Sequence, residues 1–174
     1  MPTINQHIRS MDLGAIIELY QLDTTIIGGT DILYFTPMVD GTTEIVFNAK
    51  AYSAVPCESS GWMVNTSNAP PRPKLKVANT QRHFFSYISA LGDLVGAELT
   101  RIRTFENFLD GNIDADPTAT LENQIYIVSK KTVHNKISVE WELIHTLERP
   151  GLRLPRRKIL KDGGFPGAGT FPRI

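Results

Sequence analysis

Apolar and polar residues alternate along the stretch Ile137-Ser138-Val139-Glu140-Trp141-Glu142-Leu143-Ile144-His145. Successive side chains of a strand point to opposite faces of its sheet, so a period of two indicates a strand with one buried face. This is the clearest such pattern in the chain. Shorter stretches of the same kind occur upstream, and they indicate that the fold is built mainly from strands.

The other predicted strands are separated by residues that favour turns. They cover residues 17–23, 32–35, 44–47, 51–55, 74–79, 97–105 and 121–128, with a short apolar run at 61–64. Gly28-Gly29 indicates a turn, Asp40-Gly41 a hairpin, and Lys130-Lys131 a turn before the last strand. Pro56 indicates a break between two strands.

One segment departs from the strand pattern. Between Thr80 and Val95 the apolar residues recur every three or four positions, which predicts an amphipathic helix. Thr80 is the expected N-cap and Gly96 the expected stop. Gly92, inside the segment, lowers the stability of such a helix by about 1 kcal/mol relative to alanine.

Many short strands and one helix predict a mainly β fold, antiparallel and β-sandwich or barrel-like. We expect this domain to cover residues 1–148. Residues 149–174 are rich in Gly, Pro and basic side chains and show no periodicity. They are expected to form an extended C-terminal arm.

The composition is typical of a globular protein, since 41% of the 174 residues are hydrophobic and 21% are charged. No apolar run approaches the roughly 20 residues that cross a bilayer, and the first residues show no signal-peptide pattern. No membrane association is therefore expected. The single cysteine, Cys57, can form no internal disulfide, which indicates folding in a reducing cytoplasm.

Charge is unevenly distributed although the chain is neutral overall. Residues 1–148 carry 11 Lys and Arg against 17 Asp and Glu, a net charge of −6, and residues 149–174 carry 7 against 1, a net charge of +6. A basic tail on an acidic body suggests pairing between the two or contact with an acidic neighbour. Nucleic acid is a weaker alternative, because no aromatic residues are interleaved with the basic ones.

The chain contains no pattern of catalytic or metal-binding residues, so neither an enzyme nor a cofactor is expected. The loop from Asp110 to Asp116 spaces its carboxylates like part of a calcium loop, but Ala115 and Leu121 stand where such a loop needs Gly and Glu. A polar turn is the better interpretation. The four histidines lack zinc-ligand spacing, and there is neither a Gly-x-Ser-x-Gly elbow nor a phosphate loop.

An ordered set of uncommon loop residues resembles the amino-terminal domain of the minor tail protein L family of lambda-like phages. Its most specific part is Arg72-Pro73-Lys74-Leu75-Lys76-Val77-Ala78-Asn79, followed by Leu91-Gly92-Asp93-Leu94-Val95-Gly96-Ala97 at the end of the predicted helix. Phe108-Leu109-Asp110-Gly111-Asn112, Ala115-Asp116-Pro117 and Pro155-Arg156-Arg157-Lys158-Ile159-Leu160 follow in the same order. The similarity spans roughly residues 15–160.

The resemblance implies a non-enzymatic structural protein of the tail tip of a long-tailed phage. Such a protein would join the distal ring that ends the tail tube to the central tip protein that determines host specificity. It would associate with itself as a trimer, be made in the host cytoplasm, and meet DNA only as cargo of the tail lumen.

A member of the family that this chain resembles continues into a carboxy-terminal domain whose cysteines bind an iron–sulfur cluster. Such a cluster needs several thiolates, and Cys57 lies outside that region, so the resemblance assigns no cluster ligand to this sequence. We expect either a shorter relative or another subunit that fills the role of the cluster domain.

Candidate interface residues lie in the basic tail and are expected to contact an acidic neighbour, with the chain's own acidic body as the alternative. They are Arg149, Arg153, Arg156, Arg157, Lys158 and Lys161. The large aromatic residues Phe35, Trp62 and Trp141 are expected in the core. A second interpretation of the whole chain is a small β-rich carbohydrate- or peptide-binding module of a virus or bacterium, which needs an exposed aromatic platform or a sheet-edge groove.

Overall fold

The computed structural model describes residues 14–37, 44–63, 70–78, 85–149 and 151. Its strands are β1 (Ile16–Asp23), β2 (Ile32–Thr36), β3 (Glu44–Phe47), β4 (Lys50–Ala54), β5 (Cys57–Ser60), β6 (Lys74–Ala78), β7 (Glu98–Phe105), β8 (Gln124–His134) and β9 (Ser138–His145). These ranges also contain the helix α2 (Phe85–Ala90) and the short 3-10 helices η1 (Thr25–Ile27), η2 (Gly92–Leu94), η3 (Glu106–Phe108) and η4 (Thr146–Glu148).

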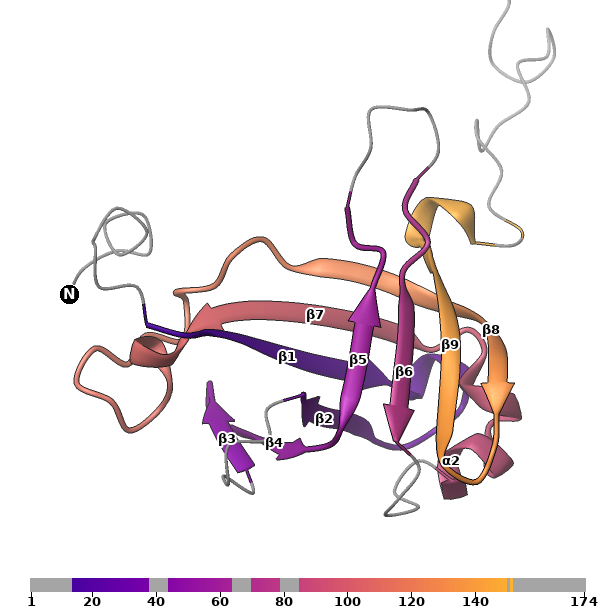
Figure 1. Ribbon diagram of the computed structural model, residues 1–174, viewed down its shortest axis with the longest axis horizontal. Helices are drawn as coiled ribbons and strands as arrows, with labels where there is room; N and C mark the ends of the chain where they lie inside the picture. The colour runs from indigo at the N-terminus through magenta and orange to yellow at the C-terminus, as the bar shows by residue number, and fades with distance from the viewer. Residues whose placement is uncertain (1–13, 38–43, 64–69, 79–84, 150, 152–174) are drawn as a thin grey trace, which may run out of the picture.

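These strands form one sheet in the order β3-β4-β2-β1-β7-β8-β9-β6-β5. Neighbouring strands are antiparallel except β2 and β4, which pair in parallel at Phe35–Ser53 and Thr36–Ala54. Figure 1 shows β1 and β7 running across the molecule, while β5, β6 and β9 cross in front of them at a steep angle. The sheet therefore curls over itself and forms two layers.

The bend between the layers lies in β8. This strand pairs with β7 through Gln124–Ile127 and with β9 through Tyr126–His134. Its pairing with β9 shifts register between Val128 and Lys130, and again between Lys131 and Val133. Because a bulge bends a strand and increases its twist, β8 can carry the sheet from one layer into the other.

The main hydrophobic core fills the space between the two layers. Its buried members include Tyr20, Leu22, Phe35, Leu75, Val77, Ile88, Leu94, Leu99, Trp141 and Leu143. A second cluster lies on the other face of β1 and consists of Ile17, Leu19, Ile45, Phe47, Tyr52 and Ile102. β1 is therefore buried on both faces. No helix in the described parts of the chain is both long and apolar enough to span a bilayer.

The prediction of a mainly β fold with one helix is confirmed. The stretch with the clearest alternation forms β9, where Val139 lies opposite Val77 of β6 and Trp141 lies opposite Leu75. All four side chains are at most 2% exposed. The expected core position of Phe35 and Trp141 is also confirmed, whereas Trp62 is only partly buried against the main core.

The predicted turn at Lys130-Lys131 is wrong, because β8 runs through both residues. Their long stems let them stay in a strand while their ammonium groups pair with Glu142 and Asp93, respectively. The turn comes a few residues later. There the side-chain oxygen of Asn135 accepts hydrogen bonds from two backbone N–H groups at the start of the next strand.

The helix is shorter than predicted. α2 ends at Ala90, well before the expected stop, and the three residues Gly92, Asp93 and Leu94 have φ of 58°, 64° and 62°. A right-handed helix cannot continue through such left-handed conformations. A contact from β9 stabilises this conformation, because the indole N–H of Trp141 donates to the Asp93 carbonyl oxygen at 3.0 Å.

β5 has no counterpart in the sequence prediction. Its four residues, Cys-Glu-Ser-Ser, show no apolar alternation, and Gly61 to Met63 after it form no strand. Three expectations lie outside the described residues: the Thr80 cap, the strand end at Val64 and the arm from residue 152 onward. The hairpin predicted at Asp40-Gly41 is wrong, because the strands that flank it, β2 and β3, do not pair with each other; both pair with β4.

Candidate functional site

The sheet order leaves β3 and β5 at its two edges. In β5 the direction of the backbone groups follows from a hydrogen bond of 2.8 Å from the Ala78 N–H to the Pro56 carbonyl oxygen. Because bonded pairs alternate along an antiparallel ladder, Glu58 turns its backbone groups toward β6, whereas Cys57 and Ser59 turn theirs away. In the described part of the chain no strand pairs with that side of β5, so it is an open edge.

The β3 edge, by contrast, is covered by the loop after η3. The Asp110 N–H donates to the Val46 carbonyl oxygen at 3.2 Å. The Asp110 carboxylate accepts from the N–H groups of Asn48 and Ala49 at 3.2 and 2.7 Å. These two turn residues have φ of 53° and 56°, as in a type I′ hairpin between β3 and β4. Among the described residues, β5 is therefore the edge whose outer backbone groups no strand or loop contacts.

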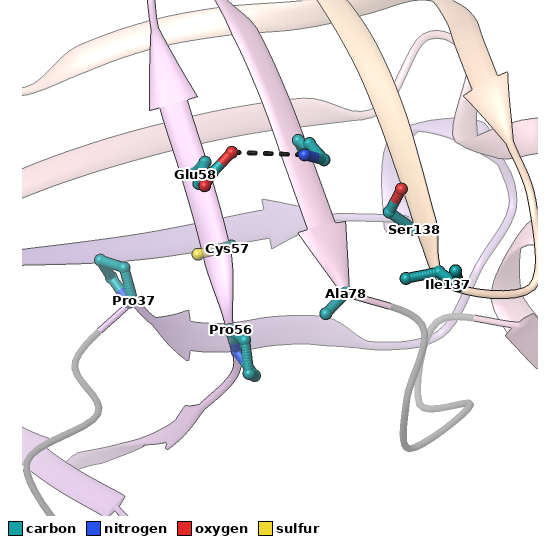
Figure 2. A pocket seen from close by; sticks show the side chains of 8 residues that line it. Pro37, Pro56, Cys57, Glu58, Ala78, Ile137 and Ser138 are labelled. Atoms are coloured by element: carbon teal, nitrogen blue, oxygen red, sulfur yellow. Dashed lines mark hydrogen bonds and ion pairs between the residues drawn. The ribbon is translucent and has the colours of Figure 1, made fainter.

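A cavity of about 410 Å³ adjoins the open edge (Figure 2). Its lining residues are Pro37, Pro56, Cys57, Glu58, Lys76, Ala78, Ile137 and Ser138. Figure 2 shows the Cys57 sulfur on the side of β5 that faces Pro37. Burial, with a smaller contribution from Glu18, raises the pKa of the Cys57 thiol to about 12. The thiol is therefore protonated at neutral pH and behaves as a small apolar group.

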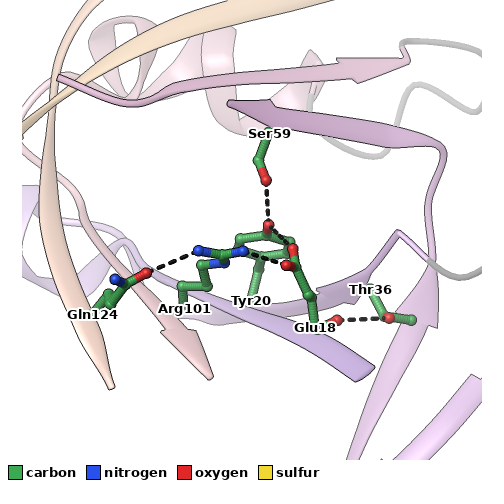
Figure 3. Close-up of polar contacts among 6 residues, drawn as sticks. All are labelled: Glu18, Tyr20, Thr36, Ser59, Arg101 and Gln124. Atoms are coloured by element: carbon green, nitrogen blue, oxygen red, sulfur yellow. Dashed lines mark hydrogen bonds and ion pairs between the residues drawn. The ribbon is translucent and has the colours of Figure 1, made fainter. Parts of the chain in front are cut away.

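A buried polar network holds β5 against the other layer (Figure 3). At its centre is Arg101 of β7, which is 8% exposed. Its guanidinium donates to the Gln124 side-chain oxygen at 2.9 Å and forms an ion pair with Glu18. Its Cζ atom lies 4.5 Å from the centre of a Trp62 ring. These charge-assisted and cation–π contacts offset the cost of removing the guanidinium from water.

Tyr20 extends this network to β5 itself. Its hydroxyl donates to the Glu18 carboxylate at 2.8 Å and lies 2.7 Å from the Ser59 hydroxyl. Since the single phenolic proton is directed at Glu18, Ser59 donates to Tyr20. Burial raises the pKa of Tyr20 well above its ordinary value, so the hydroxyl is neutral and acts as a structural hydrogen-bonding group. β1 and β5, which are far apart in the sheet order, are thereby joined directly.

The outward surface of β5, β6, β8 and β9 carries a set of ion pairs, which we call the ion-paired face. The pairs are Lys74–Glu140 (3.2 Å), Lys76–Glu58 (3.4 Å), Lys130–Glu142 (3.1 Å), Arg72–Glu142 (3.6 Å) and Arg72–Glu148 (3.5 Å). Four cations meet four carboxylates, so this face is self-neutralised. It offers no excess positive charge to nucleic-acid phosphates, and each exposed pair adds little to stability.

The predicted interface residues are almost all in the part of the chain that the structure leaves undescribed. Arg149 follows η4 and is exposed. Arg153, Arg156, Arg157, Lys158 and Lys161 lie outside the described residues. Their interface role stays a prediction.

The polar-turn interpretation of the loop from Asp110 to Asp116 agrees with its hydrogen bonds. The Asp116 carboxylate accepts from the N–H and the hydroxyl of Thr118 at 2.8 and 2.7 Å, and these bonds lower its pKa. The Asn112 side chain donates to the Glu106 carbonyl oxygen at 2.6 Å. Among the described residues no three His, Cys, Asp or Glu side chains are placed to hold a metal ion.

Sequence reasoning did not predict the features that define this site. The polar residues of β5 gave no strand signal, and nothing in the sequence shows that Arg101 pairs with Glu18, 83 residues away. One signal was available: Arg101 lies inside a predicted strand, on the same parity as apolar residues, where a charge needs a buried partner. The partner itself can be found only from the fold.

A solved structure shares this fold. A chain of the virion of a native gene transfer agent (GTA) particle superposes with a TM-score of 0.58 at 13% sequence identity. The match covers 90% of the present chain and 49% of the other, so the present chain spans about half of that protein.

Sequence comparison gives a family. Tail tip protein L of Escherichia phage lambda is 23% identical over 164 residues, which cover 91% of the present chain and 70% of the lambda protein. The family described as phage minor tail protein L matches residues 25–165. This match includes every described strand from β2 to β9, and therefore β5, the cavity beside it and Arg101, whereas Glu18 and Tyr20 of β1 precede it. The chain therefore belongs to the phage minor tail protein L family.

Proposed function

We propose that the chain is a structural component of the tail tip of a long-tailed phage. In this role it joins the distal ring of the tail tube to the central tip protein that determines host specificity. The family match over residues 25–165, which includes a relative named tail tip protein, carries the proposal. The protein works by contacting other subunits and catalyses no reaction.

Two features of the site support an assembly role. The open edge of β5 offers the backbone groups of Cys57 and Ser59 to another strand, a common basis of protein–protein contact. The network around Arg101 fixes this edge in position before a partner arrives. Pre-organisation reduces the conformational entropy lost on association.

The charge distribution suits a protein past which DNA moves without binding. The ion-paired face pairs each of its cations with a carboxylate, so it presents no unpaired basic stripe to phosphate groups. We propose self-association as a trimer, with the basic tail contacting an acidic surface of a neighbouring subunit.

Location in the particle tests the proposal. In the phage that carries the gene, immunogold labelling of purified virions is expected to mark the tail end distal to the head. Deleting the gene is expected to give tails that lack a normal tip in negative-stain images. Label along the whole tube, or virions without the protein, would contradict the assigned place.

A free ligand-binding module is the second candidate, because a sheet edge beside a cavity can also hold an extended peptide. A module of this kind stays monomeric when mixed with neighbouring tail proteins and binds peptides or sugars alone. Mass measurement of such mixtures in solution separates the two. A mass that rises only with tail proteins supports the structural role.

A further inference from the structure

Ile113 lies at the tip of the loop between η3 and β8, and its side chain is 99% exposed. No other large hydrophobic side chain in the described residues is more than 79% exposed. A single exposed apolar residue is ordinary by itself. Ile113 differs, because the loop that carries it is held in one conformation while leaving its side chain uncovered.

Hydrogen bonds define the tip of the loop. The Ala115 N–H donates to the Asn112 carbonyl oxygen at 3.2 Å, which closes a four-residue turn with Ile113 at its second position. The Asn112 side chain in turn donates to the Glu106 carbonyl oxygen at 2.6 Å. The position of Ile113 is therefore set by backbone groups on both of its sides.

The base of the loop is packed and anchored as well. Phe105, Phe108 and Ala119 form a hydrophobic cluster of their own, and each is at most 4% exposed. The Asp116 N–H donates to the Phe108 carbonyl oxygen at 3.2 Å, and the Asp110 carboxylate binds the turn between β3 and β4. An apolar side chain on such a support loses little conformational entropy when it enters a partner.

The charge around Ile113 is negative. Residues 104–129 contain no Lys or Arg and five carboxylates, Glu106, Asp110, Asp114, Asp116 and Glu122. None of these forms an ion pair with a described cation, in contrast to the carboxylates of the ion-paired face. Such a field repels the phosphates of nucleic acids and attracts a surface that carries Lys or Arg.

We propose that Ile113 inserts into an apolar pocket bordered by basic side chains on a different protein of the tail. The apolar tip supplies the buried anchor, and the surrounding carboxylates face the basic border. The inference rests on the proposed assembly role, and it adds the contact residue and the chemistry of the partner surface.

Two cavities of the described chain lack this chemistry. The cavity beside β5 has Lys76 as its basic lining residue, and that ammonium is already paired with Glu58 at 3.4 Å. A second cavity of about 280 Å³ is lined by residues of β2 and β4 with Val55 and Tyr87, and includes no Lys or Arg. Neither cavity of a second copy therefore fits the loop, so we place the pocket on a different protein.

Binding measurements on the full-length chain test the contact. The purified distal ring protein and the purified central tip protein of the same phage are each titrated with the wild-type chain and with Ile113→Ser. With at least one of them, Ile113→Ser is expected to raise the Kd about 30-fold, because the buried apolar anchor is lost.

The matched control is Ile137→Ser, in the turn between β8 and β9. Ile137 is also an isoleucine and is 77% exposed. Figure 1 shows that turn at the end of the molecule opposite the loop after β7. The control should change the Kd less than about twofold. Because both side chains are largely exposed, both variants should unfold at the wild-type temperature.

A charge variant tests the acidic surroundings separately. Asp114→Asn removes one negative charge at nearly constant size. It is expected to weaken the same complex about threefold at about 50 mM salt and to reduce the salt dependence of binding. Glu98→Gln, at the other end of β7, removes the same charge and should have less than about a twofold effect.

Three binding results would overturn the inference: no binding to either protein, an unchanged Kd for Ile113→Ser, or equal losses for Ile113→Ser and Ile137→Ser. A photo-crosslinking p-benzoylphenylalanine at position 113 then identifies the receiving surface in assembled tails. Crosslinks to apolar residues bordered by Lys or Arg on another tail protein are expected, and crosslinks to a second copy of this chain or to DNA would contradict the inference. Virion location is measured on the unchanged chain, so failure of this inference and failure of the proposed function give different results.

Discussion

The two edges of the sheet differ, because a loop contacts the β3 edge and no described segment pairs with the outer side of β5. At the β3 edge, Asp110 forms hydrogen bonds with the backbone of Val46 and of the Asn48–Ala49 turn. A loop of the chain itself therefore lies where a strand of another molecule could pair. At the β5 edge, Cys57 and Ser59 keep their backbone groups free in the described structure, and a buried network holds the strand from behind. An uncovered edge can pair with another chain, so the proposed assembly role places its edge contact at β5 rather than at β3.

The largest expected effect comes from removing the support of the open edge. Arg101→Met leaves the Glu18 carboxylate without its cation in a partly buried position and removes the contact with Trp62. We expect a loss of about 3 kcal/mol in the free energy of unfolding, measured by urea denaturation. Lys76→Met breaks only an exposed ion pair and should cost at most about 0.5 kcal/mol. Equal losses would show that the network does not stabilise this layer.

The stability that Tyr20 contributes through its bonds to Ser59 and Glu18 should fall at alkaline pH. Burial raises the pKa of Tyr20 above its ordinary value of 10.0, so above pH 10 the unfolded chain loses this proton while the folded chain keeps it. The unfolded state is then favoured, and stability falls as pH rises. Tyr20→Phe is expected to cost about 1 kcal/mol at pH 7 and to remove about 1 kcal/mol of the loss between pH 10 and 11. An unchanged pH slope in the variant would assign that loss to other groups.

Opening the closed edge should have a smaller and strictly local effect. Asp110→Ala removes the acceptor of the Asn48 and Ala49 N–H groups and should cost about 1 kcal/mol. Hydrogen exchange is expected to become faster at those two amides and to stay unchanged at Cys57 and Ser59. Asp114→Ala in the same loop serves as control and should leave the exchange of all four amides unaltered. A change at β5 would mean that the two edges are coupled.

The smallest effect concerns the turn that closes the β3 edge. Ala49 has a φ of 56°, which is strained for an L-residue, and it follows Asn48. Ala49→Gly creates the Asn-Gly pair preferred in a type I′ turn and should stabilise the chain by about 0.5 kcal/mol in thermal unfolding. Ser53→Gly in β4, where no positive φ occurs, should instead destabilise it. Destabilisation by both would contradict the hairpin assignment.

The sequence predicts those parts of the fold that depend on local pattern. β9 and β6 follow from their alternation, β1 from a shorter version of it, and β2 from a short apolar run. β5 could not be predicted, because Cys-Glu-Ser-Ser is held by a hydrogen bond to Tyr20 and by pairing with β6 rather than by apolar alternation. The end of α2 depends on a contact from Trp141, 48 residues further along the chain. The site is thus defined by long-range partners that local pattern does not contain.

The pairing of β1 with β7 has a consequence for the chain while it is synthesised on the ribosome. Ile16 lies opposite Phe105, so β1, which also pairs with the nearby β2, waits roughly 80 residues for its second neighbour. At a synthesis rate of about 5–20 residues per second, that delay lasts roughly 4–16 seconds. Throughout it, the edge of β1 that pairs with β7 along its whole length has no partner. The nascent chain therefore has a window of vulnerability to aggregation on the ribosome, which ends when β7 emerges.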